Sequence, residues 1–383
     1  MHALPPAISG PERGRTRLRR DLRSPRLRLG ITALALSLGG WGCASKPLIG
    51  YSTETAPLVL LPITDTGVND KRGRFREIYC AVLEQHGHDL PDYRPCDEAL
   101  TRVGTEPAGS GEAAPLGNSQ RGLVAAVVGG IGYDCIAPWL VPAGTTVANL
   151  RKYGYDMTLL KVDALSGTTR NARLIRDALM AMDPPSGKPR LVLIGYSKGI
   201  DDVLEALVTY PEIRSRVAAV VSAAGAVGGS PLANDAEQYQ ANLFQHFPKA
   251  TCDGGDGGGV ESLRPQTRKA WLAQNRLPDG IPYYSLVTFP NPDRISSILR
   301  SSYNKLSRVD GRNDSQVIFY DQVIPNSALV GYVNADHWAL ALPIARTHST
   351  IGSLFVTQNA YPREALAEAT LRFVEEDLSK PSP

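Results

Sequence analysis

The chain has 383 residues, of which 43% are hydrophobic and 21% charged. These values exclude a largely disordered protein and suit one large α/β unit with insertions. Aromatic residues make up only 7% of the chain, which argues against a stacking surface for single-stranded nucleic acid. The net charge of +3 comes from residues 1–30, which hold eight arginines and two acids. The rest of the chain is mildly acidic, so no basic face for nucleic acid is expected.

Residues 1–43 have the pattern of an export signal. An arginine-rich stretch is followed by an apolar run at 29–38 and by small residues that end at Cys43. Gly42-Cys43 resembles the end of a bacterial lipoprotein signal, in which the cysteine is acylated and anchors the protein to a membrane. Gly40 stands where such signals usually carry Leu, so an ordinary signal-peptidase site is the alternative. Both interpretations predict a protein of the bacterial cell envelope or a secreted one.

Four further cysteines follow Cys43, and an oxidising compartment permits them to form disulfides. Their even number predicts two bridges. Cys80 and Cys96 are close in sequence and are the expected pair, which leaves Cys135 and Cys252 by elimination. The alternative is that some remain free, buried thiols. None of them has zinc-ligand spacing, so no metal site is expected.

The remaining chain divides by pattern at residue 122. Residues 44–121 are predicted as an N-terminal segment with a strand at 58–62, a helix near 73–85 and a long surface loop after residue 104. In residues 122–383, short apolar runs alternate with amphipathic helical patterns, which predicts a doubly wound, mostly parallel α/β sheet. The runs lie at 123–128, 157–162, 191–194, 217–223, 283–289 and 328–333, and helices are expected at 174–182, 200–208 and 364–378.

Residues 229–280 interrupt the alternation and are predicted as a helical insertion that covers the sheet as a lid. The insertion contains an amphipathic stretch at 237–247, a glycine run at 253–259 and a second helix near 266–275. The glycine run lacks the spaced ligands of a calcium-binding repeat. It is therefore interpreted as a flexible linker.

The strongest functional signal is Gly195-Tyr196-Ser197-Lys198-Gly199, which follows a predicted strand and opens a predicted helix. This strand–turn–helix setting is typical of a nucleophilic serine, because the strained turn lifts the hydroxyl above the sheet. The flanking glycines avoid collisions with neighbouring backbone. The start of the helix presents the Lys198 N–H to a developing oxyanion. The alternative is a structural turn with an idle serine.

With this motif and strand rhythm, residues 122–380 resemble the α/β-hydrolase superfamily, and within it the bacterial lipase and esterase group. Members of that superfamily carry Ser, then Asp or Glu, then His along the chain. The resemblance therefore implies that an acid and a histidine follow Ser197. His337 stands in the loop after the last predicted strand, where the superfamily keeps its base. His246 lies in the insertion and His348 in a Thr/Ser-rich stretch, so His337 is the candidate.

The acid should follow the predicted strand at 283–289. Asp314 lies in Asn-Asp-Ser-Gln-Val, which resembles the Asn-Asp-Gly-x-Val segment that carries the acid in many bacterial lipases, with Ser315 in place of the Gly. Asp321 lies in Asp-Gln-Val-Ile-Pro, which is similar to another form of the same site, and it is the alternative acid. A turn or cap aspartate is the structural alternative for each.

The second oxyanion donor is expected in Gly129-Gly130-Ile131-Gly132, directly after the first core strand. In the family a His-Gly-x or Pro-Gly-x stands here and x donates its N–H, which implies Ile131. A phosphate-binding loop is the competing interpretation, but no Lys-Ser/Thr follows. The resemblance implies acyl transfer through Ser197 with His337 as base, for which no cofactor is needed.

An export signal and a predicted lid together favour a hydrophobic or lipid-like ester as substrate, cleaved by water. Acyl transfer to an alcohol by the same residues is a second enzymatic hypothesis. A non-catalytic envelope protein that kept the fold is a third. The presence of Ser, Asp and His in the family's chain order argues against the third hypothesis.

Overall fold

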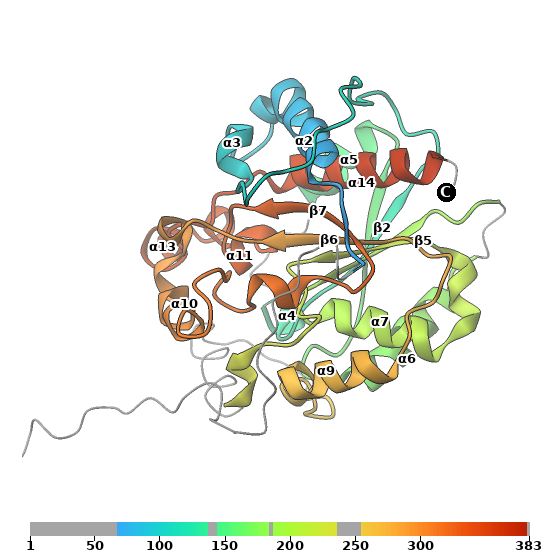
Figure 1. The fold of residues 1–383 in the computed structure, drawn as a ribbon, viewed down its shortest axis with the longest axis vertical. Helices are drawn as coiled ribbons and strands as arrows, with labels where there is room; N and C mark the ends of the chain where they lie inside the picture. The colour runs from blue at the N-terminus through green and yellow to red at the C-terminus, as the bar shows by residue number, and fades with distance from the viewer. Residues whose placement is uncertain (1–66, 137–143, 184–186, 236–253, 381–383) are drawn as a thin grey trace, which may run out of the picture. The chain divides into compact units, whose positions relative to one another are not determined.

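The computed structural model describes residues 67–136, 144–183, 187–235 and 254–380 (Figure 1). The chain divides into Met1–Pro47 and Leu48–Pro383, and only the second unit contains described residues. Several predicted features lie outside the described residues: the export signal with Cys43, the strand at 58–62, the amphipathic stretch at 237–247, and Cys252. These features stay predictions.

A seven-stranded sheet, in the order β1-β7-β6-β5-β4-β2-β3, forms the centre of the described part of the chain. Every neighbouring pair of these strands is parallel, as predicted. Six strands coincide with predicted runs: β2 (Val124–Val128), β3 (Asp156–Leu160), β4 (Leu191–Tyr196), β5 (Val217–Ala223), β6 (Tyr283–Thr288) and β7 (Ala328–Val333). The edge strand β1 (Asn69–Asp70) has no counterpart among the predictions, because two polar residues carry no apolar pattern.

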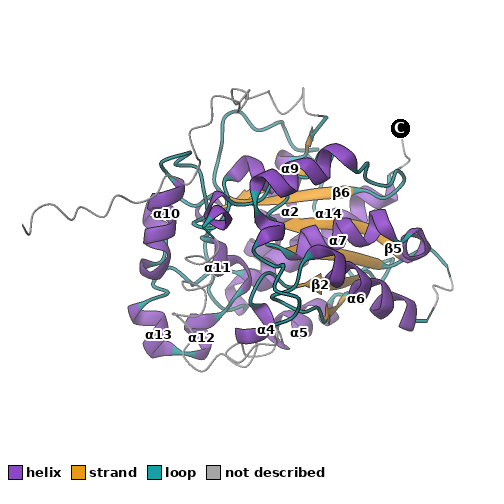
Figure 2. Cartoon of the chain, turned by 90° about the horizontal axis from the view of Figure 1, so that it is seen from below, coloured by secondary structure: helices purple, strands orange, loops and turns teal. Residues whose placement is uncertain are grey.

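Helices cover both faces of the sheet (Figures 1 and 2). One face carries α2 (Arg72–His86), α5 (Gly144–Lys152) and α14 (Arg363–Ser379), and the other carries α6 (Thr168–Ala181), α7 (Gly199–Thr209) and α9 (Pro265–Gln274). Side chains along a strand point alternately to the two faces. Ala125 and Val221 accordingly join the apolar core under α2 and α14, while Ala126 and Val220 join the core under α6 and α7. Of these helices, only α5 was without a sequence prediction.

The described part of the N-terminal segment belongs to this same sheet and core. Helix α2 buries Phe75 and Ile78 against it, and β1 pairs with β7. The predicted disulfide between Cys80 and Cys96 is formed and joins α2 to α3 (Cys96–Ala99). Cys135 is buried, and the second predicted bridge stays a prediction because Cys252 lies outside the described residues.

Shorter helices surround the end of the sheet where the strands finish. They are α4 (Tyr133–Ile136), α10 (Arg300–Leu306), α11 (His337–Ala341), α12 (Ile344–Thr347) and α13 (Ser349–Leu354). None of the helices in the described ranges is long and apolar enough to cross a membrane.

The glycine run of the insertion is attached to the core. The Gly259 N–H donates to the Leu165 carbonyl at 2.9 Å, and the Gly167 N–H donates to Asp256 Oδ1 at 2.8 Å. The Asp256 N–H in turn donates to Ser166 Oγ at 3.0 Å. The composition of the run, which predicted a flexible linker, did not reveal these partners of residues 254–259 on a distant loop.

Candidate active site

The predicted site residues all lie beyond the carboxyl ends of parallel strands, which meet at one edge of the sheet. Ser197 follows β4, His337 follows β7, and Asp314 lies in the connection between β6 and β7. The Gly129–Gly132 turn follows β2, which is the neighbour of β4 in the sheet. The topology thus brings four segments that are far apart in sequence to one place.

Ser197 has the strained backbone that the motif predicts. Its φ is +55°, in the left-handed region that non-glycine residues rarely adopt. The turn is tight: a Cβ on Gly195 would lie 2.3 Å from Ile200 Cα, so only glycine fits there. The Ser197 N–H donates to the Ala223 carbonyl of the neighbouring strand at 3.2 Å. These contacts hold Ser197, which is only 6% exposed, at the end of β4.

Ser197, His337 and Asp314 form one hydrogen-bonded chain. His337 Nε2 lies 2.9 Å from Ser197 Oγ, and His337 Nδ1 lies 2.7 Å from Asp314 Oδ2. The imidazole is further fixed through its backbone, because the His337 N–H donates to the Asp314 carbonyl at 2.9 Å. The Tyr196 hydroxyl donates to the His337 carbonyl at 2.8 Å. This geometry allows a proton to pass between the serine and the histidine.

The Asp314 carboxylate is completely buried and accepts hydrogen bonds on both oxygens. Oδ1 accepts from the backbone N–H groups of Gln316 and Val317, at 2.9 and 2.8 Å. Oδ2, which also bonds to His337, accepts from the Gln322 amide at 3.3 Å and from the Thr288 hydroxyl. Sequence reasoning missed Thr288 and Gln322. Thr288 lies one residue before the end of the predicted strand at 283–289, which is its only sequence signal, and nothing in the sequence singles out Gln322.

The structure brings Asp314, and not Asp321, to His337. Asp321 lies in the short 3₁₀ helix Phe319–Gln322, and its carboxylate makes no hydrogen bond to His337. Its backbone carbonyl accepts from the Gly228 N–H at 2.8 Å. Burial raises the pKa of the Asp321 carboxyl to about 7. Asp321 is therefore a buried residue of the supporting loop and has no place in the hydrogen-bonded chain.

The glycine turn after β2 lies against the serine. A Cβ on Gly130 would lie 2.7 Å from Ser197 Cβ and 3.1 Å from Ser197 Oγ. Among the described residues, no acceptor is bonded to the backbone N–H of either Ile131 or Lys198. Two unpaired N–H groups on loops beside the serine are what a developing oxyanion requires.

Apolar side chains from several loops gather next to this turn. Ile131 packs against a buried cluster that includes Ala226 and Ala233 after β5, Val260 and Leu263 from the insertion, and Val317. The described part of the insertion is thus in contact with the loop that holds the predicted oxyanion donor.

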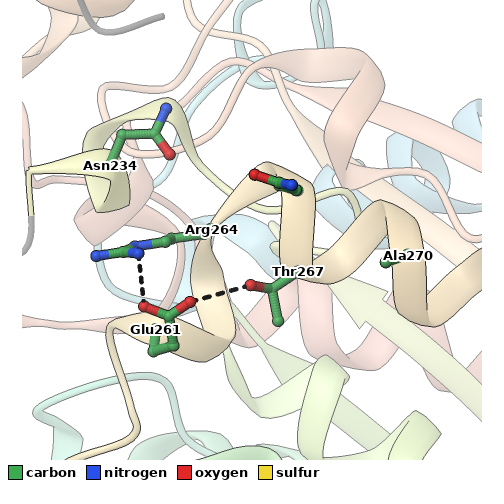
Figure 3. A pocket seen from close by; sticks show the side chains of 6 residues that line it. Asn234, Glu261, Arg264, Thr267 and Ala270 are labelled. Carbon is green, nitrogen blue, oxygen red and sulfur yellow. Dashed lines mark hydrogen bonds and ion pairs between the residues drawn. The ribbon is translucent and has the colours of Figure 1, made fainter. Parts of the chain in front are cut away.

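A hollow of about 470 Å³ lies on the insertion side, around the start of α9 (Figure 3). Its lining residues are Asn234, Glu261, Arg264, Gln266, Thr267 and Ala270. Glu261 forms an ion pair with Arg264 at 2.8 Å and accepts from the Thr267 hydroxyl at 3.3 Å. None of Ser197, His337 and Asp314 lines this hollow. No group of three or more His, Cys, Asp or Glu residues in the described ranges is arranged to hold a metal ion.

Comparison with known proteins places the chain in a family. No family model and no curated protein matches it. It is similar to the solved metagenomic carboxyl esterase MGS0156, with 39% identity and a TM-score of 0.78, over 84% of this chain and 97% of that one. Two structures are more distant. The mature lipase BlEst2 of Bacillus licheniformis has 19% identity and a TM-score of 0.47, over 63% of this chain and 93% of that one, and EstA of Clostridium botulinum has 12% identity and a TM-score of 0.49, over 77% and 97%. The chain belongs to the α/β-hydrolase superfamily, among its carboxyl esterases.

Proposed function

We propose that the protein is a carboxylic ester hydrolase in which Ser197 is the nucleophile, His337 the general base and Asp314 the acid of a catalytic triad. The hydrogen-bonded chain from Ser197 Oγ through the imidazole to the Asp314 carboxylate carries this proposal. The similarity to a carboxyl esterase supports the choice of reaction.

Catalysis takes two steps. The Ser197 hydroxyl proton passes to His337 Nε2 while Oγ bonds to the ester carbonyl carbon, and the N–H groups of Lys198 and Ile131 bind the oxyanion. The imidazolium then gives its proton to the alcohol oxygen as the ester C–O bond breaks, which leaves an acyl-enzyme. Water then bonds to the acyl carbon and gives a proton to His337 Nε2. The imidazolium returns this proton to Ser197 Oγ as the bond between Oγ and the acyl carbon breaks, which releases the carboxylic acid.

Asp314 keeps the imidazole in the required tautomer. Its bond to Nδ1 places the proton on that nitrogen and leaves Nε2 free to accept the proton of Ser197. Because Asp314 is fixed by four further donors, the ring cannot turn without breaking buried hydrogen bonds.

The substrate that we propose is a hydrophobic or lipid-like ester. The apolar cluster around Ile131 offers a water-poor surface next to the reacting carbonyl, where electrostatic stabilisation is strongest. The insertion 229–280 is proposed as a lid, supported by the contact of Val260 and Leu263 with this cluster. Export by the leader, with Cys43 as the acylated anchor, would place the enzyme in the bacterial cell envelope near such substrates.

The test is labelling of the full chain with a fluorophosphonate probe, followed by hydrolysis of p-nitrophenyl esters of increasing acyl length. Labelling is expected in the wild type and absent in Ser197→Ala. Ser285→Ala is the matched control, since the hydroxyl of this buried serine of β6 bonds to the Ser327 hydroxyl and accepts from the Ile324 N–H, away from His337. Absence of labelling in the wild type would contradict the proposal. A preference for longer acyl chains supports the lipid-like substrate, and a preference for acetate contradicts it.

The proposed anchor is tested separately. In a bacterial host, the wild-type chain is expected in the membrane fraction and Cys43→Ser in the soluble fraction. Equal partitioning of the two proteins would contradict the acylation of Cys43.

A further inference from the structure

A buried ion pair lies directly below the nucleophile turn. The Lys198 side chain is 1% exposed and its Nζ donates to Asp202 Oδ1 at 2.6 Å, one turn along α7. Removing two charges from water is costly, and an apolar pair of similar volume is often as stable. An ion pair at this position therefore calls for an explanation other than stability.

Asn171 of α6 connects this pair to a second loop. The side chain is 1% exposed, and its Nδ2 donates to Asp202 Oδ2 at 2.9 Å and to the Asp163 carbonyl at 3.1 Å. Its Oδ1 accepts from the Asp163 N–H at 3.1 Å. The Asn171 amide group thus binds the N–H and the carbonyl of Asp163, and also the Asp202 oxygen that Lys198 does not bind.

The path continues to the glycine turn. The carbonyl of Ala164, the residue after Asp163, accepts from the Gly132 N–H at 3.2 Å. Gly132 directly follows Ile131. Hydrogen bonds and two steps along the backbone therefore connect the Lys198 side chain to Ile131, with the Asn171 side chain in the middle.

We propose that Asn171 is a positioning residue that fixes the separation of the Ile131 and Lys198 N–H groups. This inference rests on the proposed function, because it concerns the same oxyanion site. An oxyanion gains from two donors only if both lie within hydrogen-bond distance of one oxygen atom. The two donors stand on loops after different strands, so a rigid connection between these loops sets their spacing. Asn171 itself touches no substrate.

The variant Asn171→Leu removes the connection, and Asn149→Leu is its matched control. Asn149 is 2% exposed and donates through Nδ2 to the buried carboxylate of Glu368 at 2.9 Å, on the opposite face of the sheet. Both variants are expected to lower the urea midpoint. Only Asn171→Leu is expected to lower kcat, by roughly 10- to 100-fold with little change in KM, because small displacements of catalytic groups have effects of this size.

Binding of a boronic acid transition-state analogue is the second readout. Its affinity for Asn171→Leu is expected to fall in parallel with kcat/KM, since the analogue places a charged oxygen in the same site. Asn171→Ser, a smaller change that keeps a short polar group, is expected to give an intermediate loss and serves if the leucine variant does not fold.

The proposal is overturned if the Asn171 variants keep their kcat, if Asn149→Leu loses as much kcat as Asn171→Leu, or if KM rises while analogue affinity is unchanged. In each of these outcomes, fluorophosphonate labelling that requires Ser197 would leave the proposed function standing. A wild type that neither reacts with the probe nor cleaves esters would overturn both.

Discussion

The turn after β4 and the loop after β6 each place one member of the proposed triad, but by different means. Ser197 has a φ of +55° in a tight turn, where a Cβ on Gly195 would lie 2.3 Å from Ile200 Cα. Asp314 Oδ1 is likewise bound within its own turn, by the Gln316 and Val317 N–H groups, but Oδ2, which faces His337, is also bound by Thr288 and Gln322. The comparison indicates that a local turn sets the backbone of the proposed nucleophile, whereas the proposed acid depends on tertiary contacts in addition to its own turn.

The largest expected effect separates the two candidate acids of the second loop. Asp314→Asn should lower kcat by about 10⁴-fold, because the amide stabilises the wrong tautomer of His337. Asp321→Asn should leave kcat nearly unchanged, since Asp321 makes no hydrogen bond to His337. The measurement is the steady-state hydrolysis of a p-nitrophenyl ester by both variants. The opposite ranking would show that Asp321 is the acid and that the loop rearranges in solution.

The second prediction tests how tightly the glycine turn after β2 packs against the turn that holds Ser197. A Cβ at Gly130 would lie 2.7 Å from Ser197 Cβ and 3.3 Å from the Tyr196 carbonyl. Gly130→Ala should therefore displace the oxyanion turn or the serine and lower kcat/KM by roughly 10²- to 10³-fold, the size of losing one oxyanion donor. Gly117→Ala is the control, because a Cβ there meets open space. Normal activity of Gly130→Ala would show that the turn is looser than its contacts indicate.

The contrast between local patterns and tertiary contacts also explains how much of the fold and of the candidate site could be predicted from the sequence. Six strands and the nucleophile turn are local patterns, and the structure has the strands where those patterns indicate. The choice between Asp314 and Asp321 stayed open, because both follow β6 in plausible motifs and only the packed loop selects one. Thr288 and Gln322 were missed because nothing local distinguishes a threonine or glutamine that binds a carboxylate from one that does not.

The insertion and the N-terminal edge were harder to predict for a related reason. The glycine run at 254–259 has the composition of a linker, and its partners lie on the loop 165–167, nearly ninety residues earlier. Strand β1 is two residues long and forms only because β7 offers a free edge. Attachments of this kind depend on distant partners, so neither periodicity nor composition reveals them.

The third prediction concerns the pH dependence of the free energy of unfolding, which we expect Asp321 in the loop after β6 to affect. Burial raises the pKa of Asp321 to about 7 in the folded chain, above its value in the unfolded chain. The protonated Asp321 carboxyl therefore makes its full contribution to the free energy of unfolding below about pH 4, and this contribution is lost as the pH rises through 7. At about 1.4 kcal/mol per pKa unit, a shift of about three units amounts to a loss of roughly 4 kcal/mol by pH 8.

Asp321→Asn tests this directly, because the amide does not ionise. The free energy of unfolding of the variant, relative to wild type, should rise between pH 4 and pH 8 in urea titrations. A constant difference between the two proteins across this range would show that Asp321 titrates normally, and therefore that water reaches its carboxyl.

The smallest effect compares the two strained serines. Ser315 has a φ of +84°, no exposed surface and a hydroxyl without a hydrogen-bond partner in the described part of the chain. It stands where the lipase segment that this loop resembles has glycine. Ser315→Gly removes backbone strain and an unsatisfied hydroxyl, partly offset by the greater freedom of glycine in the unfolded chain, so a gain of about 1 kcal/mol is expected.

Urea unfolding of Ser315→Gly measures this gain, and the hydrolysis rate should not change because Ser315 lies outside the hydrogen-bonded chain. Ser197→Gly would relieve the same kind of strain at a φ of +55° but should abolish labelling by the fluorophosphonate probe. A loss of stability in Ser315→Gly would mean that its side chain packs favourably enough to outweigh the strain. The strain at position 197 belongs to the turn of the proposed nucleophile, whereas the strain at position 315 serves no step of the proposed reaction, so we expect that only the second can be removed without loss of catalysis.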